Sequence, residues 1–383
     1  MKIVVKRLPF LAALETACSV TPAQSMRPGL KNALFRGDAE GNLDIEATDM
    51  EVGIRVRVKA ESIDGPGAGC LPCHSLAKLL KESRDELVSL DVAIKPQEKD
   101  DFVNSVLSVG LDVYEIPGMG HQYFPILPKV PTGEVAEIKP EALNKMLART
   151  IPSASKNAGH YALNGVFLQG DGKILNAVAT DGCRLTVCKH KLKVDAGLKE
   201  GVILPLKMAN ELRHLCDETP KEELLHFALS GRQFTAWNST AMLSSLLVEG
   251  FFPKYQPVIP KDLDKEATFN REVLLSALRR AEVLSDGALE TRAVQFDFST
   301  GLCTITNIGQ GSGKATIKLA VEYTGEPIWV RLDTRRLVPT VGLLDVETVR
   351  MEMLNPSRPV IIREGQDFTF VLMSVKDNDG EPK

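Results

Sequence analysis

Cysteine and histidine are the first candidates for chemistry in this sequence, because they serve as nucleophiles, general bases and metal ligands. Cys183, Cys188 and His190 lie close together in the chain. Their strand-like context indicates alternating faces, and no acidic residue that could orient a base sits at a recognisable spacing. The six histidines stand at positions 74, 121, 160, 190, 214 and 226 and form no cluster with ligand spacing. An enzyme with Cys183 as nucleophile is kept only as an alternative.

Two short motifs resemble binding motifs without completing them. Residues 309–315, Gly-Gln-Gly-Ser-Gly-Lys-Ala, would need glycine at 308 and Ser or Thr at 315 to match a P-loop, so a hairpin tip is the better interpretation. Cys70 and Cys73 form a C-x-x-C, but neither a second ligand pair nor a βαβ unit accompanies them. The sequence predicts no catalytic residue, no metal site and no cofactor.

Composition places the chain among ordinary globular proteins. Its 383 residues are 44% hydrophobic and 25% charged, and this length allows two to four domains. Seven cysteines, an odd number, fit a reducing compartment. No apolar run approaches the roughly 18 residues of a membrane helix, and no secretory segment opens the chain. We expect a cytoplasmic protein with no membrane contact. The net charge of −4 argues against a uniformly basic nucleic-acid binder, but it does not show whether positive charge is concentrated on one face of the protein.

A long-period repeat organises the elements. The phrase Ala-Thr-Asp occurs around Thr48 and again around Thr180, and a fainter copy surrounds Thr306. The two steps are 180 − 48 = 132 and 306 − 180 = 126 residues. A unit of about 130 residues is of domain size, so each copy should have its own core.

Amphipathic helical patterns repeat with the same period, two in each unit. The predicted helices are 7–19, 74–85, 140–153, 206–217, 271–286 and 332–344. Pro339 is expected to interrupt the last of them. Together these ranges hold 13 Lys or Arg and 10 Asp or Glu, a slight excess of positive charge.

Short alternating strands separate the helices and favour antiparallel pairing. We predict an α+β fold of three similar domains, each an antiparallel sheet with two helices. The domains are 1–128, 129–260 and 261–383, the first two ending in proline-punctuated segments around Pro125 and Pro253.

Five motifs together resemble the beta subunit of bacterial DNA polymerase III, the sliding clamp family. They are Tyr-Ala-Leu-Asn-Gly-Val at 161–166, Ala-Thr-Asp-Gly-Cys-Arg-Leu at 179–185, the Gly-x-Phe-Pro-x-Tyr segment at 250–260, Asn355-Pro356, and Ala-Thr-Asp-Met-Glu-Val at 47–52. The resemblance covers the whole chain. It implies the DNA-clamp fold, closed as a head-to-tail homodimer into a six-domain ring around duplex DNA, and a processivity factor with no catalysis of its own.

The resemblance also implies partners and contacts. The partners are double-stranded DNA, the catalytic subunit of DNA polymerase III, the clamp loader and other proteins with a clamp-binding motif. Residues implied near DNA are Arg27, His74, Lys78 and Lys207. Residues implied at the dimer contact are Leu111 and Val113, on a strand of the first domain, and Val283 and Leu284, at the end of a helix in the third. A repeat-built interaction scaffold without a DNA role is the other alternative.

A partner-peptide pocket between the second and third domains is implied by the same motifs. Its residues are Leu163, Thr180, Gly182, Cys183, Arg184, Leu185, Pro253, Pro257, Val258, Pro359, Val371, Met373, Ser374 and Val375. Cys183 stands where the family usually has histidine, Pro257 where a basic residue is frequent, and Ser374 where proline is usual, so the peptide preference stays open. A core role is the competing interpretation for Leu163 and Val258.

Overall fold

The computed structural model describes residues 1–92, 102–133, 135–157, 159, 161–284, 293–307 and 313–375. The chain groups into two compact units. Unit 1 combines Met1–Glu141 with Asn210–Leu247, and unit 2 combines Ala142–Ala209 with Val248–Lys383. The middle third of the sequence therefore contributes to both units.

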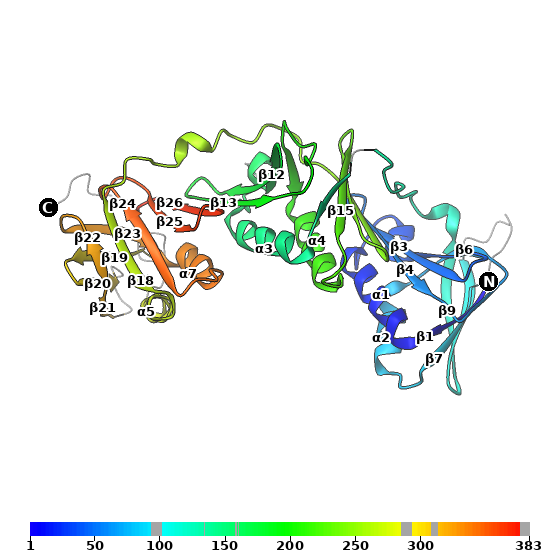
Figure 1. The fold of residues 1–383 in the computed structure, drawn as a ribbon. Helices are drawn as coiled ribbons and strands as arrows, with labels where there is room; N and C mark the ends of the chain where they lie inside the picture. The colour runs from blue at the N-terminus through cyan, green and yellow to red at the C-terminus, as the bar shows by residue number, and fades with distance from the viewer. Residues whose placement is uncertain are drawn as a thin grey trace. The chain divides into compact units, whose positions relative to one another are not determined.

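Unit 1 is built on one antiparallel sheet of thirteen strands (Figure 1), in the order β10-β15-β16-β17-β4-β3-β2-β6-β9-β8-β7-β1-β5. The strands are β1 (Lys2–Lys6), β2 (Ala33–Gly37), β3 (Asn42–Thr48), β4 (Val52–Lys59), β5 (Ser62–Asp64), β6 (Gly67–Leu71), β7 (Leu87–Asp91), β8 (Phe102–Val109), β9 (Asp112–Gly120), β10 (Ala136–Ile138), β15 (Leu225–Ser230), β16 (Gln233–Trp237) and β17 (Ala241–Leu246). Short 3-10 turns lie at η1 (Pro28–Lys31) and η2 (His121–Tyr123).

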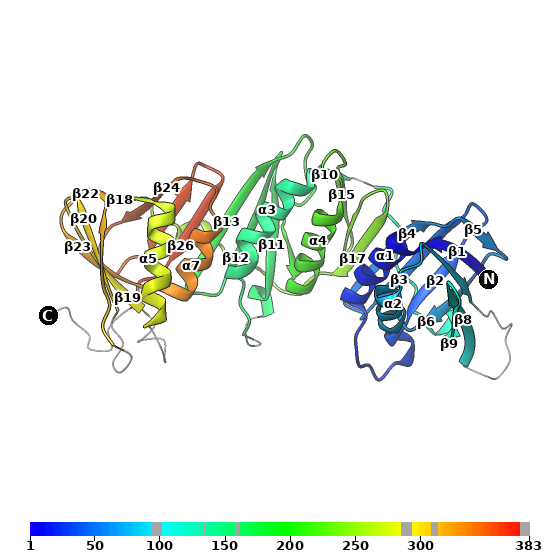
Figure 2. The ribbon, with the colours of Figure 1, turned by 90° about the horizontal axis from the view of Figure 1, so that it is seen from below.

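Helices α1 (Arg7–Val20) and α2 (Cys73–Glu82) lie side by side in unit 1 (Figure 2). Phe10, Leu14 and Ala17 recur at helical spacing along α1, and all three are buried. The helix packs on β3 and β4, and the Phe10 ring meets Phe35 of β2 edge to face at 6.2 Å. This burial of one apolar stripe fixes the helix against the sheet.

Unit 2 holds two antiparallel sheets. The nine-stranded sheet has the order β14-β11-β12-β13-β26-β25-β24-β18-β22, and the four-stranded sheet has the order β21-β20-β19-β23. The strands are β11 (Gly165–Asp171), β12 (Ile174–Thr180), β13 (Arg184–Lys191), β14 (Val202–Pro205), β18 (Lys265–Asn270), β19 (Ala293–Ser299), β20 (Leu302–Asn307), β21 (Thr316–Ala320), β22 (Glu322–Thr324), β23 (Ile328–Asp333), β24 (Thr348–Met353), β25 (Val360–Glu364) and β26 (Phe368–Leu372). Its 3-10 turns are η3 (Ile151–Ser153), η4 (Tyr161–Leu163) and η5 (Gln256–Val258).

Helices α5 (Arg271–Val283) and α7 (Thr334–Gly342) pack against each other in unit 2. Asn270 caps α5 by accepting the amide of Val273 at 3.1 Å, and Asp333 caps α7 by accepting the amide of Arg335 at 3.0 Å. Helices α3 (Pro140–Thr150) and α4 (Leu206–Glu218) each contain residues of both units.

The predicted α+β class with antiparallel sheets is confirmed, and within the described residues each third of the chain holds two α-helices. The expectation for Pro339 is wrong, because α7 continues through it. Buried Leu337 and Val341 on either side hold the turn in place, and the Thr340 hydroxyl donates to the Arg336 carbonyl at 3.0 Å. The helix predicted at 140–153 ends earlier, since Pro152 falls in η3. The glycine-rich stretch at 309–315 lies largely outside the described residues.

The repeated Ala-Thr-Asp phrase folds into the same turn twice. The hydroxyl of Thr48 donates to the Val52 carbonyl at 2.8 Å, and that of Thr180 donates to the Arg184 carbonyl at 2.6 Å. The residue two positions after each threonine has a positive φ, 81° at Met50 and 86° at Gly182. Among the described residues Met50 is the single non-glycine residue with positive φ. The sequence repeat is thus also a repeat of backbone conformation.

Candidate functional site

The turn between β12 and β13 is fixed by the side chain of Asp181. Its Oδ1 accepts the backbone amides of Cys183 and Arg184 at 2.9 and 3.0 Å, the pattern of an Asx turn. Gly182 meets the need for positive φ at no steric cost. The local sequence alone is therefore sufficient to build this corner.

Two arginines hold the other carboxylate oxygen of Asp181. Oδ2 lies 3.2 Å from Nε of Arg184 and 3.3 Å from Nε of Arg336, which also donates to Asp333 at 2.7 Å. Arg184 additionally donates to the Pro152 carbonyl. Burial lowers the pKa of Arg184. Burial also acts to lower the pKa of Arg336, but the neighbouring groups, Asp181 first among them, outweigh it and raise this pKa. This network joins the turn between β12 and β13 to α7. The sequence analysis identified Arg184 as a site residue but did not identify Arg336.

The last described strand runs along the same corner. Leu185 of β13 pairs with Val371 of β26, and the Met373 amide donates to the Cys183 carbonyl at 2.9 Å. Beyond it, the Ser374 hydroxyl and the Val375 amide both donate to the Arg331 carbonyl, at 3.2 and 2.9 Å. The bond between the Met373 amide and the Cys183 carbonyl places Met373, the residue after β26, opposite Cys183 and close to Leu185.

A buried apolar cluster forms the floor beneath this strand. Leu185 and Val371 pack there with Tyr255 and Ile361, and Leu185 is only 3% exposed. Phe252 packs against the cluster and stacks on Phe167, with ring centroids 4.7 Å apart. Four segments far apart in the sequence therefore converge on one core.

The remaining predicted pocket residues lie around this floor, all within unit 2. Val258 is 50% exposed and Met373 is 40% exposed, so each presents an apolar side chain to solvent. The predicted residues that are half-buried are Leu163, Thr180, Cys183, Arg184, Ser374 and Val375, while Gly182, Pro253 and Pro257 are exposed. A core role thus does not describe Leu163 or Val258, but it does describe Leu185, Val371 and Pro359. Such a strip of apolar anchors beside backbone groups can bind an extended peptide.

The cysteine and histidine candidates do not assemble into a reactive group. Cys188 is buried, and burial raises the pKa of its thiol to about 12, which keeps it protonated. Burial lowers the pKa of His190. Within the described part of the chain, no group of three or more His, Cys, Asp or Glu could hold a metal ion, and no helix is long and apolar enough to cross a membrane.

The residues implied near DNA occupy different settings. Arg27 is exposed in the segment after α1, and its amide donates to Ser25 Oγ at 3.1 Å. His74 is half-buried, with Nε2 3.1 Å from the Thr21 carbonyl at the start of that segment. Lys78 is exposed on α2. Lys207 is half-buried on α4 and belongs to unit 2.

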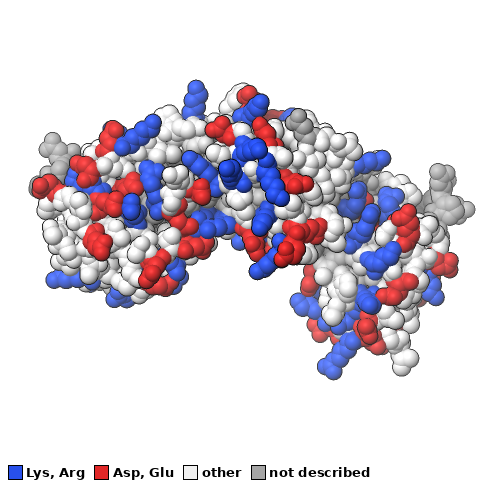
Figure 3. Space-filling view, in the orientation of Figure 1, with Lys and Arg blue, Asp and Glu red and all other residues white. Residues whose placement is uncertain are grey.

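The helices as observed carry twelve Lys or Arg and eight Asp or Glu. Not every cation is directed to solvent. Arg149 of α3 is buried, 2.8 Å from Glu364, and donates to the Leu343 carbonyl. Figure 3 shows both signs of charge interspersed over the visible face. The helices therefore carry only a small excess of positive charge, and their electrostatic attraction to phosphate is moderate.

The residues implied at the dimer contact are apolar and accessible. Leu111 is 101% exposed and Val283 is 79% exposed, and Val113 is exposed as well. Leu284 is half-buried and caps α5. Leu111 lies on the turn between β8 and β9, not on a strand as expected, because Gly110 with φ 58° turns the chain there.

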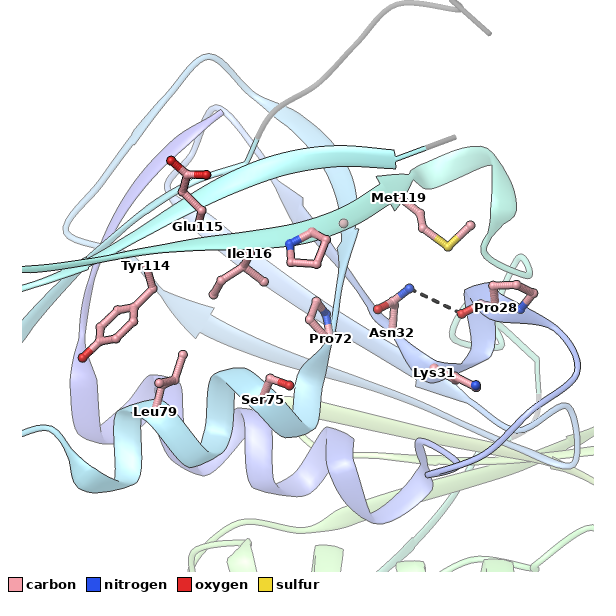
Figure 4. A pocket seen from close by; sticks show the side chains of 12 residues that line it. Pro28, Lys31, Asn32, Pro72, Ser75, Leu79, Tyr114, Glu115, Ile116 and Met119 are labelled. Atoms are coloured by element: carbon pink, nitrogen blue, oxygen red, sulfur yellow. Dashed lines mark hydrogen bonds between the residues drawn. The ribbon is translucent and has the colours of Figure 1, made fainter. Parts of the chain in front are cut away.

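Strand β9 offers backbone groups beside Leu111 and Val113. In the described part of the sheet only Met119 and Gly120 of β9 pair with β6, so its remaining residues have a ladder partner on one side only, β8. A cavity of about 520 Å³ adjoins this strand (Figure 4), between Tyr114 and Ile116 on one side and Ser75 and Leu79 of α2 on the other. An edge of this kind is suited to pairing with another strand.

Comparisons with known proteins agree along nearly the whole chain. Models of the N-terminal, central and C-terminal domains of the DNA polymerase III beta subunit match residues 1–128, 137–254 and 256–376. The beta sliding clamp of Caulobacter vibrioides is 27% identical over 383 residues, covering 98% of this chain and 100% of the relative. That of Pseudomonas aeruginosa is 25% identical over 378 residues, with the same coverage.

Solved structures give the same result for the fold. The P. aeruginosa sliding clamp bound to griselimycin superposes with a TM-score of 0.90 at 24% identity, covering 98% of this chain and 100% of that one. The Caulobacter crescentus beta sliding clamp superposes with a TM-score of 0.88 at 25% identity, covering 98% and 99%. The repeated plan, the corner motif and these matches lead to one assignment: the chain belongs to the DNA polymerase III beta subunit family.

Proposed function

We propose that this protein is a DNA sliding clamp, a processivity factor that encircles duplex DNA and tethers the replicative polymerase. The observation that carries the proposal is the match of all three family domains, in order, along nearly the whole chain. The proposal places three domains at 1–128, 129–260 and 261–383 and closes two copies head to tail into a ring. The proposed site of action of the protein is the cytoplasm, where it encircles the DNA.

The inner surface of the ring is proposed to be lined by helices. The helical cations Lys78, Arg279 and Arg280 are exposed, and we propose that they face the DNA together with the exposed Arg27. His74 and Lys207 are proposed as further DNA contacts. Phosphate contacts lose affinity steeply with salt, so the modest charge excess of the helices supports retention by encirclement and not by tight binding.

The strip beside β26 is proposed to receive the polymerase catalytic subunit, the clamp loader and other proteins that carry a clamp-binding motif. The accessible side chains of Val258 and Met373, above a buried floor, support this. A short segment that orders on binding gives modest affinity and allows partners to exchange. Cys183 and Ser374 would shape the peptide preference. The clamp itself performs no catalytic step.

Loading on circular DNA tests the clamp function. Protein loaded on a nicked circle should remain bound at a salt concentration that abolishes direct binding, and linearising the circle should release it. Equal loss from circular and linear DNA at that salt would refute encirclement. A scaffold without a DNA role would not be retained on either DNA.

A further inference from the structure

Helices α1 and α2 of unit 1 bring two cysteines into contact. The Sγ atoms of Cys18 and Cys73 are 3.0 Å apart, although the residues are 55 positions apart in the sequence. The partner of Cys73 is therefore not Cys70, its neighbour in the C-x-x-C. The thiol of Cys70 instead contacts the Gly120 carbonyl at 3.7 Å, and burial raises its pKa to about 12.

The two thiols have different access and different acidity. Cys18 is half-buried, so a small oxidant can reach it, whereas Cys73 is buried and also lies 3.3 Å from the Leu14 carbonyl. The hydrogen bond with Cys73 lowers the pKa of Cys18, and the same contact together with burial raises the pKa of Cys73. A thiolate reacts with oxidants and a thiol does not, so Cys18 is the entry point.

We propose that Cys18 and Cys73 form a reversible disulfide that joins α1 to α2, with hydrogen peroxide as the oxidant. The Cys18 thiolate attacks the peroxide O–O bond, takes one oxygen as sulfenic acid and releases hydroxide. Sγ of Cys73 then attacks Sγ of Cys18, the S–O bond breaks, and the hydroxide leaves as water with the Cys73 proton. The hydroxide from the first step takes up the proton that Cys18 lost on ionising, so in total two thiols are oxidised and one hydrogen peroxide is reduced to two waters. A dithiol reverses the step by exchange.

The geometry requires little movement. A disulfide bond is about 2.05 Å long, so the two sulfur atoms must approach by about 1 Å. Cys18 lies in the last turn of α1 and Cys73 opens α2. His74, next to Cys73, contacts the Thr21 carbonyl at 3.1 Å, which is where the Arg27 segment begins. The bond would therefore join the C-terminal end of α1 to the N-terminal end of α2. The proposal does not depend on the clamp function.

Thiol counting on the full-length protein tests this. Reduced protein freed of reductant is treated with equimolar hydrogen peroxide, blocked with iodoacetamide and weighed intact. The protein is denatured before the iodoacetamide is added, so that every free thiol is labelled. We expect the number of labelled thiols to fall from seven to five on oxidation, and treatment with dithiothreitol to restore seven. The oxidised protein should unfold at a temperature several degrees higher, and the reductant should remove this difference, because a crosslink restricts the unfolded chain.

Variants assign the bond. Cys70 and Cys73 share one tryptic peptide, since no Lys or Arg separates them, so mapping is done in Cys70→Ser, which should still lose two thiols. Cys18→Ala and Cys73→Ala should each abolish the loss. Cys18→Ala, at the half-exposed position, gives the answer even if Cys73→Ala fails to fold. An undiminished loss of two thiols in Cys18→Ala, or a wild-type protein that accumulates Cys18 sulfinic acid with Cys73 still free, would overturn the proposal.

Discussion

At the scale of single residues, the turns at Thr48 and Thr180 place two different residue types in the same left-handed backbone conformation. Gly182 adopts φ 86° without strain, whereas Met50 holds φ 81° with a side chain present. A left-handed conformation costs a non-glycine residue roughly 1–2 kcal/mol. Since the Thr48 and Asp49 side chains make the same hydrogen bonds as Thr180 and Asp181, these bonds hold Met50 in place.

Met50→Gly should stabilise the protein. The relief of strain exceeds the extra unfolded-state freedom of glycine, so we expect a gain of about 0.5–1 kcal/mol in the free energy of unfolding. Gly182→Ala is the matched control, because a Cβ there meets nothing within 4 Å and any loss of stability comes from the backbone alone. Urea unfolding of both variants measures the effect. A loss of stability in Met50→Gly would show that contacts of the Met50 side chain matter more than its φ.

Met373→Ala should weaken partner binding without changing the fold. Met373 is half-exposed beside a buried floor, so its truncation should cost roughly 1–3 kcal/mol of peptide binding, the range for an anchor residue. The measurement is titration of a fluorescent peptide carrying the clamp-binding motif of the cognate polymerase. Val194→Ala, an equally accessible apolar residue in unit 2, is the control and should bind normally. Leu185→Ala is a poorer test, since its burial makes it a core deletion. Unchanged peptide affinity in Met373→Ala would show that the apolar strip beside β26 is not the partner-binding site.

At the scale of elements, one buried ion pair fastens α3 to its surroundings. Arg149 donates to both oxygens of Glu364, at 2.8 and 3.0 Å, and lies 3.3 Å from Asp345. Its guanidinium also sits 5.0 Å above the ring of Phe368. A charge on a helix thus serves packing here, which the count of helical cations could not reveal.

Glu364→Gln should destabilise the protein by about 3 kcal/mol. Removing one partner of a buried pair leaves the other charge uncompensated, and Asp345 can compensate only in part. Glu266→Gln breaks the solvent-exposed pair with Arg350 and should cost less than about 1 kcal/mol. Thermal or denaturant unfolding compares the two. Equal effects would show that the Arg149 pair is no stronger than a surface contact.

Asp345 gives this region a dependence on pH. The hydrogen bond from Lys145 lowers the pKa of its carboxyl below 3.8. A group with a depressed pKa contributes stability that is present above its unfolded pKa and lost as pH falls through its folded pKa. Below pH 3.8 the unfolding temperature of the wild type should therefore fall more steeply than that of Asp345→Asn. The difference should be small, because the Asp345 side chain is 65% exposed. Parallel pH profiles would disprove the effect.

At the scale of the whole molecule, the proposed ring depends on a contact between two copies. Val283 at the end of α5 and Leu111 on the β8–β9 turn are both accessible, and β9 offers unpaired backbone groups beside Leu111 within the described sheet. Apolar side chains of this kind beside a strand edge favour association.

Val283→Asp should yield a folded monomer. A charge placed in the apolar contact would be left without solvent or a partner, which disfavours assembly. Mass by light scattering and secondary structure by circular dichroism provide the readout. Val273→Asp, on the same helix at a position 50% exposed, should remain dimeric. A Val283→Asp protein with unchanged dimer mass and dissociation would place the contact elsewhere.

The sequence by itself determined the features that depend on local pattern. The repeat of about 130 residues, the six α-helices of the described residues, the antiparallel strands and the Asp181 corner all follow from spacing and turn chemistry, because short segments carry that information. The family resemblance rests on such segments as well. Helix ends were displaced by a few residues, as at Pro152 after α3 and at the N-cap Asp333 before α7.

Tertiary structure alone decided what depends on contacts between distant segments. It buried Leu185 and Val371 while leaving Val258 and Met373 accessible, although all four are apolar in sequence. It joined Arg336 to Asp181 across 155 positions, and it gave Cys73 a partner on another helix in place of its motif neighbour Cys70. No periodicity encodes such pairings, since each depends on how sheets and helices pack after the local elements have formed.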